Sequence, residues 1–275
     1  MSEHEFDFND QDFARVKKMV YDFAGIDLND SKKSLVYNRL SKRIRFLGLS
    51  SFKAYLDYVV EQGESEFVHL INAITTNLTF FFRENHHFEY LAETVIPRLI
   101  KENQRTKKIR IWSAGCSTGE EPYSLAIVLK ETMPAGWDAR VIATDLDTNV
   151  VQTGQSGVYK DDRLKGVSES RKKRWFLKGG GSMQGWIKVK PELQEIIDFG
   201  QINLMNDWPI KEKLDVIFCR NVVIYFDKPT QSKLFDRYAN QMADSGYLFV
   251  GHSESLYKVC DRFELLGKTI YQKTY

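Results

Sequence analysis

The feature that most constrains the fold of this chain is a short apolar segment followed at once by a turn of small residues. Residues 109–112 predict a buried strand, residues 113–121 form the turn, and residues from about 122 to 132 predict a helix. A second predicted strand, 140–143, leads into Asp145. Strands that alternate with helices predict a mostly parallel, doubly wound α/β sheet with a ligand at the carboxyl ends of the strands.

Further predicted strands extend this pattern to the C-terminus, at residues 214–219, 246–251, 263–266 and 269–272. Residues 175–178 and 186–189 flank a run of three glycines and predict a small antiparallel insert, placed at about 172–200. A further strand at 196–199 belongs either to this insert or to the main sheet.

The beginning of the chain predicts helices alone. Apolar residues recur at helical spacing in four consecutive segments, at residues 10–25, 30–48, 52–60 and 64–74. Asp10 is a candidate cap for the first helix, and no strand-like alternation interrupts the series. These patterns divide the chain into an all-α domain, a linker that contributes to the ligand site, and an α/β domain, at residues 1–75, 76–98 and 99–275.

The turn at 113–121 carries two acidic residues and lacks a phosphate-binding signature. No Gly-Lys-Ser/Thr sequence follows it, so it is not a Walker loop. Glu120 and Glu121 would repel a pyrophosphate, but they suit a cationic ligand such as S-adenosylmethionine, with its ammonium and sulfonium groups. Asp145 is placed to accept hydrogen bonds from ribose hydroxyls. The alternative is a glutamate pair favoured by the helix dipole, with a solvated Asp145.

Charge and cysteine content narrow the function classes. The formal net charge of the 275 residues is only +2, which does not indicate a general nucleic-acid binder. Three widely separated cysteines, with no paired metal-ligand spacing, indicate a reduced, cytoplasmic compartment. The acidic N-terminus predicts no signal peptide, and no apolar run reaches the about 18 to 20 residues of a membrane span.

A histidine pair is the only other sign of a metal site in the sequence. His86 and His87 lie near Glu84 and Glu89, but adjacent residues on a helix point about 100° apart. We therefore expect no metal.

Five motifs resemble those of the chemotaxis receptor methyltransferases, the CheR family. They occur in the family's order and span the whole chain: TNLTFFFRE (76–84), STGEEPYS (117–124), ATDLD (143–147), CRNVVIYF (219–226) and GHSES (251–255). The resemblance implies a class I, Rossmann-like methyltransferase domain with a small antiparallel β insert, preceded by an all-α domain. It also implies transfer of a methyl group from S-adenosylmethionine to glutamate carboxylates of chemotaxis receptors, which leaves S-adenosylhomocysteine and a glutamyl methyl ester.

The resemblance also implies roles for individual residues. Arg83 and Tyr225 are expected closest to the transferred methyl group, where they would orient the substrate carboxylate. The expected cofactor contacts come from the linker and from the strand ends: Asn77, Thr79, Arg83, Glu121, Asp145, Asn203, Leu204, Arg220 and Asn221. Cys116 stands in the turn where the family pattern leads us to expect a smaller residue, and it fits there sterically.

Two surfaces are candidates for contact with the receptor. Arg39, Lys42 and Arg43 form a cationic stripe at helical spacing, which suits an acidic helix of the receptor's cytoplasmic domain; the alternative is a solvated helix face. The edge of the β insert is a candidate site for a receptor's C-terminal tail peptide, which would add as a strand. The resemblance does not decide whether this chain uses that site. We expect a monomer that neither inserts into the membrane nor binds nucleic acid.

Two alternatives share the predicted cofactor site. One is a methyltransferase that acts on a nucleic acid or a small molecule, although the Asn/Asp-Pro-Pro-Tyr motif common in base-amine methylation is absent at residues 220–222. The other is a non-catalytic module that binds S-adenosylmethionine or a receptor tail and regulates assembly. The presence of Arg83, Asp145 and Tyr225 argues against the second alternative.

Overall fold

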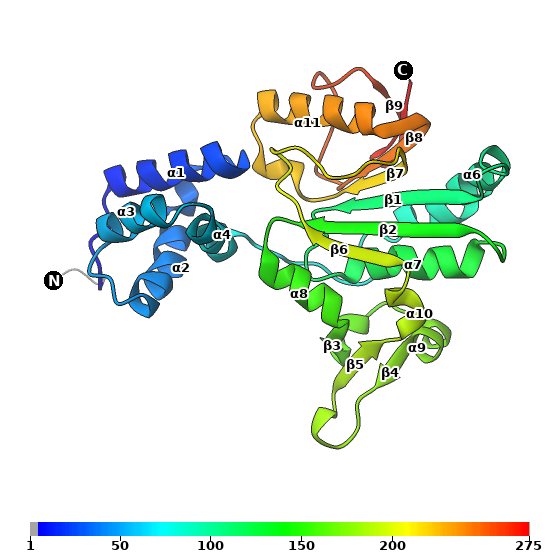
Figure 1. Ribbon diagram of the computed structural model, residues 1–275, viewed down its shortest axis with the longest axis horizontal. Helices are drawn as coiled ribbons and strands as arrows, with labels where there is room; N and C mark the ends of the chain where they lie inside the picture. The colour runs from blue at the N-terminus through cyan, green and yellow to red at the C-terminus, as the bar shows by residue number, and fades with distance from the viewer. Residues whose placement is uncertain (1–4, 275) are drawn as a thin grey trace.

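The N-terminal unit is a cluster of four helices, as predicted. The computed structural model describes residues 5–274. The helices are α1 (Asp10–Ala24), α2 (Lys33–Phe46), α3 (Phe52–Gln62) and α4 (Glu64–Ile74), with a 3-10 turn, η1 (Asp30–Lys32), before α2. Their apolar faces meet in one core around Val16, Leu40 and Leu56, each of which is fully buried. Figure 1 shows this unit beside the sheet domain.

Both ends of α1 have a clear local cause. Asn9, rather than the expected Asp10, caps the helix, because its side chain accepts from the Asp12 amide while Asp12 accepts from the Asn9 amide. Gly25 ends the helix in the left-handed region, at φ 70°. Glycine adopts that conformation without steric cost.

An extended linker and an interrupted helix lead into the α/β domain. Residues 75–85 contain no helix or strand, and the helical segments α5 (His86–Tyr90), η2 (Leu91–Val95) and α6 (Ile96–Glu102) follow end to end. The middle segment is a π turn. The fully buried Leu91, Val95 and Ile96 anchor this helix in the core on one face of the main sheet.

The main sheet has seven strands in the order β6-β2-β1-β7-β8-β10-β9. In that order the bounds are Ile197–Gln201, Asp138–Asp145, Lys108–Ala114, Leu214–Cys219, Met242–Val250, Ile270–Lys273 and Phe263–Gly267. The pairs β6–β2, β2–β1, β1–β7 and β7–β8 are parallel, and β10 pairs antiparallel with both β8 and β9. This arrangement confirms the predicted doubly wound sheet, in which the strand order reverses at β1.

Helices cover both faces of this sheet, so that β1 is buried on each side. Ile111 packs in the core with α7 (Glu120–Thr132), whereas Trp112 packs with Tyr238 of α11 (Lys228–Gln241). A further helix, α8 (Thr148–Ser156), follows β2. Neither α8 nor α11 was predicted from the sequence. Burial on both faces explains why the successive residues Ile111 and Trp112 are both apolar.

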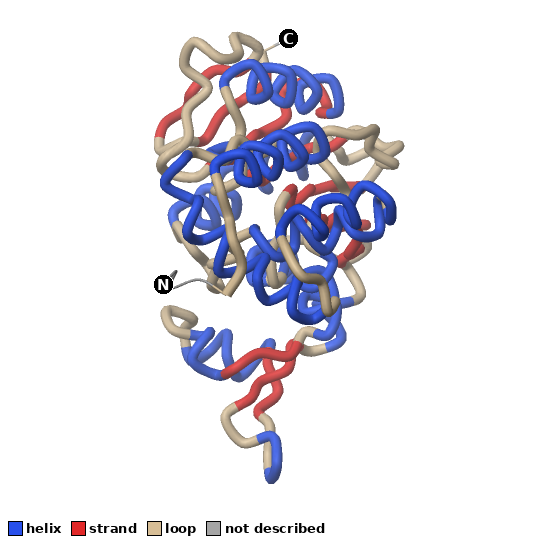
Figure 2. The backbone as a smooth tube through the Cα atoms, turned by 90° about the vertical axis from the view of Figure 1, so that its left-hand side faces the viewer, coloured by secondary structure: helices blue, strands red, loops and turns tan. Residues whose placement is uncertain are grey.

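The β insert begins earlier than expected. A separate three-stranded antiparallel sheet has the order β3-β5-β4, with bounds Val158–Lys160, Trp186–Val189 and Phe176–Lys178. The short segments η3 (Asp161–Leu164), α9 (Glu169–Trp175) and η4 (Gly181–Met183) connect its strands, and α10 (Pro191–Gln194) leads back. The region placed at 172–200 is therefore corrected, because the insert starts at Val158 and β6 belongs to the main sheet. Figure 2 shows this small sheet projecting from the domain.

Candidate active site

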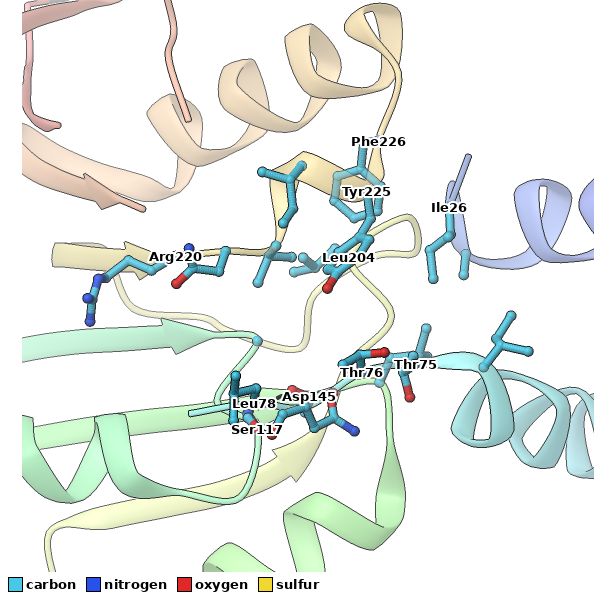
Figure 3. A pocket seen from close by; sticks show the side chains of 18 of the residues that line it. Ile26, Thr75, Thr76, Leu78, Ser117, Asp145, Leu204, Arg220, Tyr225 and Phe226 are labelled. Atoms are coloured by element: carbon cyan, nitrogen blue, oxygen red, sulfur yellow. Dashed lines mark hydrogen bonds between the residues drawn. The ribbon is translucent and has the colours of Figure 1, made fainter. Parts of the chain in front are cut away.

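A cavity of about 440 Å³ lies where β1, β2 and β7 end, and segments of the N-terminal unit close one side of it. This volume falls in the range of small-molecule sites. Every residue predicted for the cofactor or the methyl group lines this one cavity: Asn77, Thr79, Arg83, Glu121, Asp145, Asn203, Leu204, Arg220, Asn221 and Tyr225. Figure 3 shows part of the lining, with Asp145 and Ser117 across the cavity from Tyr225.

Asp145 ends β2 at the floor of the cavity. Its Oδ2 accepts from the Ser117 amide at 2.8 Å, and its Oδ1 accepts from the Asp147 amide at 3.0 Å. Burial raises the pKa of Asp145 to about 6, although these amides oppose the shift. The carboxylate is therefore fixed in place and remains ionised at neutral pH, as an acceptor for two ribose hydroxyls must be.

We expect the affinity for S-adenosylmethionine to depend on pH through Asp145. Only the ionised carboxylate accepts two hydroxyl hydrogen bonds, so affinity should fall about tenfold per pH unit below pH 6 and level off above pH 7. Calorimetric titration from pH 5 to 8 measures this. Asp145→Asn should abolish the pH dependence, and an equally steep profile in that variant would assign it to another group.

The turn after β1 approaches the neighbouring loop closely. Gly115 has φ 93°, and a Cβ built there would lie 2.3 Å from Cγ2 of Val222. Only glycine allows this backbone to reach the cavity. Glu120 differs from our expectation, because it does not line the cavity; it is fully buried and accepts from Thr118 and from Arg163.

Arg220 joins the strand end to the linker. Its guanidinium lies 2.9 Å from Oε2 of Glu121 and 3.2 Å from Oε2 of Glu84, and it also donates to the Arg83 carbonyl. Only 2% of the Arg220 side chain is exposed. The guanidinium extends away from the cavity in Figure 3. Arg220 therefore holds the walls of the cavity together, and its charge is already balanced by two carboxylates.

Arg83 and Tyr225 differ from Arg220 in having free functional groups. Arg83 donates to the Leu78 carbonyl at 2.8 Å and forms no ion pair within residues 5–274. Its charge is thus available to an anion in the cavity. The Tyr225 ring projects into the cavity from the turn η5 (Val223–Tyr225), as Figure 3 shows.

The N-terminal unit supplies a wall that the sequence analysis missed. It contributes Ala24, Ile26, Asp27, Leu28, Asn29, Lys32 and Leu35 to the lining. The Asp27 amide donates to the Tyr225 carbonyl at 2.8 Å, and Ile26 forms an antiparallel bridge with Phe226. Asn203 donates to the Phe23 carbonyl at 2.6 Å. These contacts are tertiary, and no local pattern indicates them.

The histidine pair lies closer together than helical spacing suggested. Glu84, His86 and His87 place possible ligand atoms within 4.8 Å of one another. The Arg220 cation already lies 3.2 Å from Glu84 Oε2 and would repel a metal ion there. Burial lowers the pKa of His87 to about 4, so its imidazole is neutral and donates from Nε2 to the Lys268 carbonyl.

Two members of the expected cationic stripe have structural partners. Arg39 donates to the Ile74 and Thr75 carbonyls at the end of α4, which caps that helix. Arg43 makes two hydrogen bonds, of 2.9 and 2.6 Å, to the buried carboxylate of Glu66. The expectation of a free stripe is corrected accordingly: of its three residues, only Lys42 is exposed and makes no side-chain hydrogen bond or ion pair within residues 5–274.

Two family models match this chain. The CheR methyltransferase SAM-binding domain matches residues 77–272, and the CheR methyltransferase all-alpha domain matches residues 11–75. The chain belongs to the CheR methyltransferase family. Its predicted family and fold are thereby confirmed.

Curated relatives of the CheR family match over nearly their full length. The chemotaxis protein methyltransferase 2 of Pseudomonas aeruginosa is 44% identical, over 97% of this chain and 94% of the relative. A probable chemotaxis protein methyltransferase of Rhizobium etli is 42% identical, over 93% of this chain and 97% of the relative. The Escherichia coli chemotaxis protein methyltransferase is 41% identical, over 96% of this chain and 91% of the relative. The chain is therefore an S-adenosylmethionine-dependent methyltransferase that acts in chemotaxis. None of the helices within residues 5–274 combines the length and apolarity of a membrane span.

Proposed function

We propose that this enzyme methylates glutamate side chains on the cytoplasmic helices of chemotaxis receptors. The observation that carries the proposal is that one cavity holds Asp145 together with the unpaired Arg83 and the hydroxyl of Tyr225. A cation and a hydroxyl group beside a sulfonium donor suit an anionic acceptor. The names of the relatives support a chemotaxis substrate.

The chemistry needs orientation rather than proton transfer. A glutamate with an ordinary pKa of about 4.3 is a carboxylate at neutral pH, so no general base is required. One carboxylate oxygen forms a bond to the methyl carbon while the carbon–sulfur bond breaks in line, and the neutral thioether of S-adenosylhomocysteine leaves. Opposite charges disappear in this step, so alignment and exclusion of water supply the catalysis, with about 7 to 11 kcal/mol available from positioning.

Arg83 and Tyr225 hold the acceptor carboxylate in this scheme. We expect Tyr225→Phe to lower kcat by about 10- to 100-fold with little change in the dissociation constant of S-adenosylmethionine, because the hydroxyl acts on the substrate in the transition state. Steady-state kinetics and calorimetry on the same preparation measure both quantities. An unchanged kcat would remove Tyr225 from the mechanism.

Receptor docking belongs to the same proposal. Lys42 on α2 offers an exposed positive charge to an acidic receptor helix. Arg39 and Arg43 instead bind groups on α4 and so hold α2 in place. Reversing the charge of Arg43 would leave Glu66 buried beside another carboxylate, so a loss of activity there would report on folding. The edge strands of the insert, β3 and β4, are candidate sites for a receptor tail peptide. The enzyme acts as a cytoplasmic monomer without a metal.

The proposal is tested by mapping the modification on a purified receptor cytoplasmic domain. After incubation with enzyme and S-adenosylmethionine, mass spectrometry should find one added methylene on peptides that contain particular glutamates. Replacing those glutamates with alanine should remove the modification. Methylation of lysine, of nucleic acid or of a small molecule in place of glutamate would contradict the proposal.

A further inference from the structure

We propose that Glu254 is a positioning residue for methyl transfer, which acts by holding the backbone of the loop 220–226 that carries Tyr225. Glu254 lies in the loop after β8, is 4% exposed, and does not line the cavity. It cannot touch a ligand in the cavity directly. Any effect it has on turnover must therefore pass through the loop that it contacts.

The carboxylate of Glu254 accepts from four backbone amides. Its Oε2 accepts from Asn221 at 2.9 Å and from Gly251 at 2.5 Å, and its Oε1 accepts from Val222 at 2.9 Å and from Ile224 at 3.2 Å. Each carboxylate oxygen thus accepts hydrogen bonds from two amides. Burial raises the pKa of Glu254, and these four amides oppose that shift. Hydrogen bonds to a buried carboxylate are among the stronger ones in proteins.

The loop needs this support because its conformation is not self-sustaining. Asn221 has φ 58°, in the left-handed region that disfavours most side chains. The following turn η5 has no side-chain cap of its own, and the Ile224 amide within it donates to Glu254. A buried amide without a partner would cost about 1 to 3 kcal/mol.

The carbonyl groups of the same loop have a separate partner. Gln231 of α11 is buried and donates through Nε2 to the carbonyls of Val223 at 2.8 Å and Phe226 at 2.9 Å. The Tyr225 carbonyl accepts from Asp27 of the N-terminal unit. The backbone is therefore fixed from three sides. Glu254 accepts from the amides of Asn221, Val222 and Ile224, whereas the amides of Tyr225 and Phe226 donate to carbonyls within the loop. Removing one acceptor oxygen should release the turn that aims Tyr225.

The test is Glu254→Gln, with Glu264→Gln as the matched control on the exposed strand β9. Gln keeps one acceptor oxygen and turns an NH₂ group toward backbone donors. We expect kcat to fall about tenfold or more and the dissociation constant of S-adenosylmethionine to change less than kcat, since Asn221 is the one expected cofactor contact that is hydrogen-bonded to Glu254 within residues 5–274. In a Tyr225→Phe background the same substitution should change kcat less than about twofold. Equal factors in both backgrounds would overturn the proposal.

The kinetic test rests on the proposed role of Tyr225. A second measurement is therefore needed that does not depend on activity. Native-state hydrogen exchange at Asn221, Val222 and Ile224 should become about tenfold faster in Glu254→Gln and stay unchanged in the control. Unchanged exchange would overturn the inference, whatever the kinetics show. If wild-type enzyme forms no glutamyl ester, the proposed function fails while this arm still decides the inference.

A second variant serves if Glu254→Gln does not fold. A Cβ at Gly251 would lie 2.5 Å from Nδ2 and 2.9 Å from the amide nitrogen of Asn221, and 2.9 Å from Glu254 Oε2. Gly251→Ala therefore displaces Asn221 and the Glu254 carboxylate by sterics, without removing the carboxylate. The same loss of kcat and the same non-additivity with Tyr225→Phe are expected. Wild-type kinetics in this variant would contradict the inference.

Discussion

Asp145→Asn should weaken binding of S-adenosylmethionine by about 100-fold or more. The substitution preserves shape but removes the negative charge and one of two acceptor oxygens. Hydrogen bonds to charged groups contribute about 1.5 to 3 kcal/mol each, and two bonds to ribose hydroxyls are at stake. The new NH₂ group would also face the amide of Ser117 or of Asp147. Isothermal titration with S-adenosylmethionine and S-adenosylhomocysteine measures the loss.

Asp198→Asn is the matched control for this prediction. Asp198 lies on the neighbouring strand β6, is exposed, and its side chain makes no hydrogen bond within residues 5–274. Its substitution should leave affinity unchanged. If Asp145→Asn bound the cofactor as tightly as the control, the nucleoside would lie elsewhere in the cavity.

Arg220→Met should reduce the free energy of unfolding by about 3 to 5 kcal/mol. The substitution roughly keeps the volume but leaves the carboxylates of Glu84 and Glu121, each 12% exposed, without their cation. Breaking a buried ion pair from one side has a cost of this size. Denaturant unfolding at pH 7 measures it. Arg45→Met is the control: Arg45 pairs with Glu5 at the surface, with side chains 59% and 50% exposed, and its substitution should leave the free energy of unfolding nearly unchanged.

The deficit of Arg220→Met should also depend on pH in a defined direction. In the wild type, burial raises the pKa of Glu84, but Arg220 and His252 outweigh burial and hold it below its usual range. For Glu121, burial outweighs Arg220 and the pKa lies above its usual range. Without Arg220 the pKa values of Glu84 and Glu121 are both higher than in the wild type, so both groups take up protons more readily in the folded state. The deficit should therefore be smallest near pH 4 to 5 and grow toward pH 7; a deficit independent of pH would contradict this account.

The cofactor side of the site could be predicted because its residues follow strands. Asp145 ends β2 and Glu121 follows the turn after β1, and the ends of parallel strands converge at one edge of a sheet. The position of a residue at a strand end therefore predicts that it lies near the ends of the neighbouring strands. The motif resemblance then added Asn77, Arg83 and Tyr225, whose positions no periodicity indicates.

Other parts of the structure depend on tertiary contacts that sequence patterns do not contain. β3 is three residues long, too short for a strand signal, so the insert was placed too late. Arg39 and Arg43 have the spacing of a solvated cationic face, yet both bind partners on α4. Glu254 lies in a recognised motif, but three of its four amide donors come from the loop 220–226, about 30 residues earlier in the chain. Only the folded structure brings them together.

The central claim is that this cavity delivers a methyl group to a carboxylate. The most direct measurement is transfer of labelled methyl groups from S-adenosylmethionine to membranes that carry chemoreceptors, followed by treatment with alkali. A carboxyl ester hydrolyses in base, so the account predicts that the label is released as methanol and that Asp145→Asn enzyme transfers little of it. Label that survives alkali, or no transfer by the wild-type enzyme, would contradict the account.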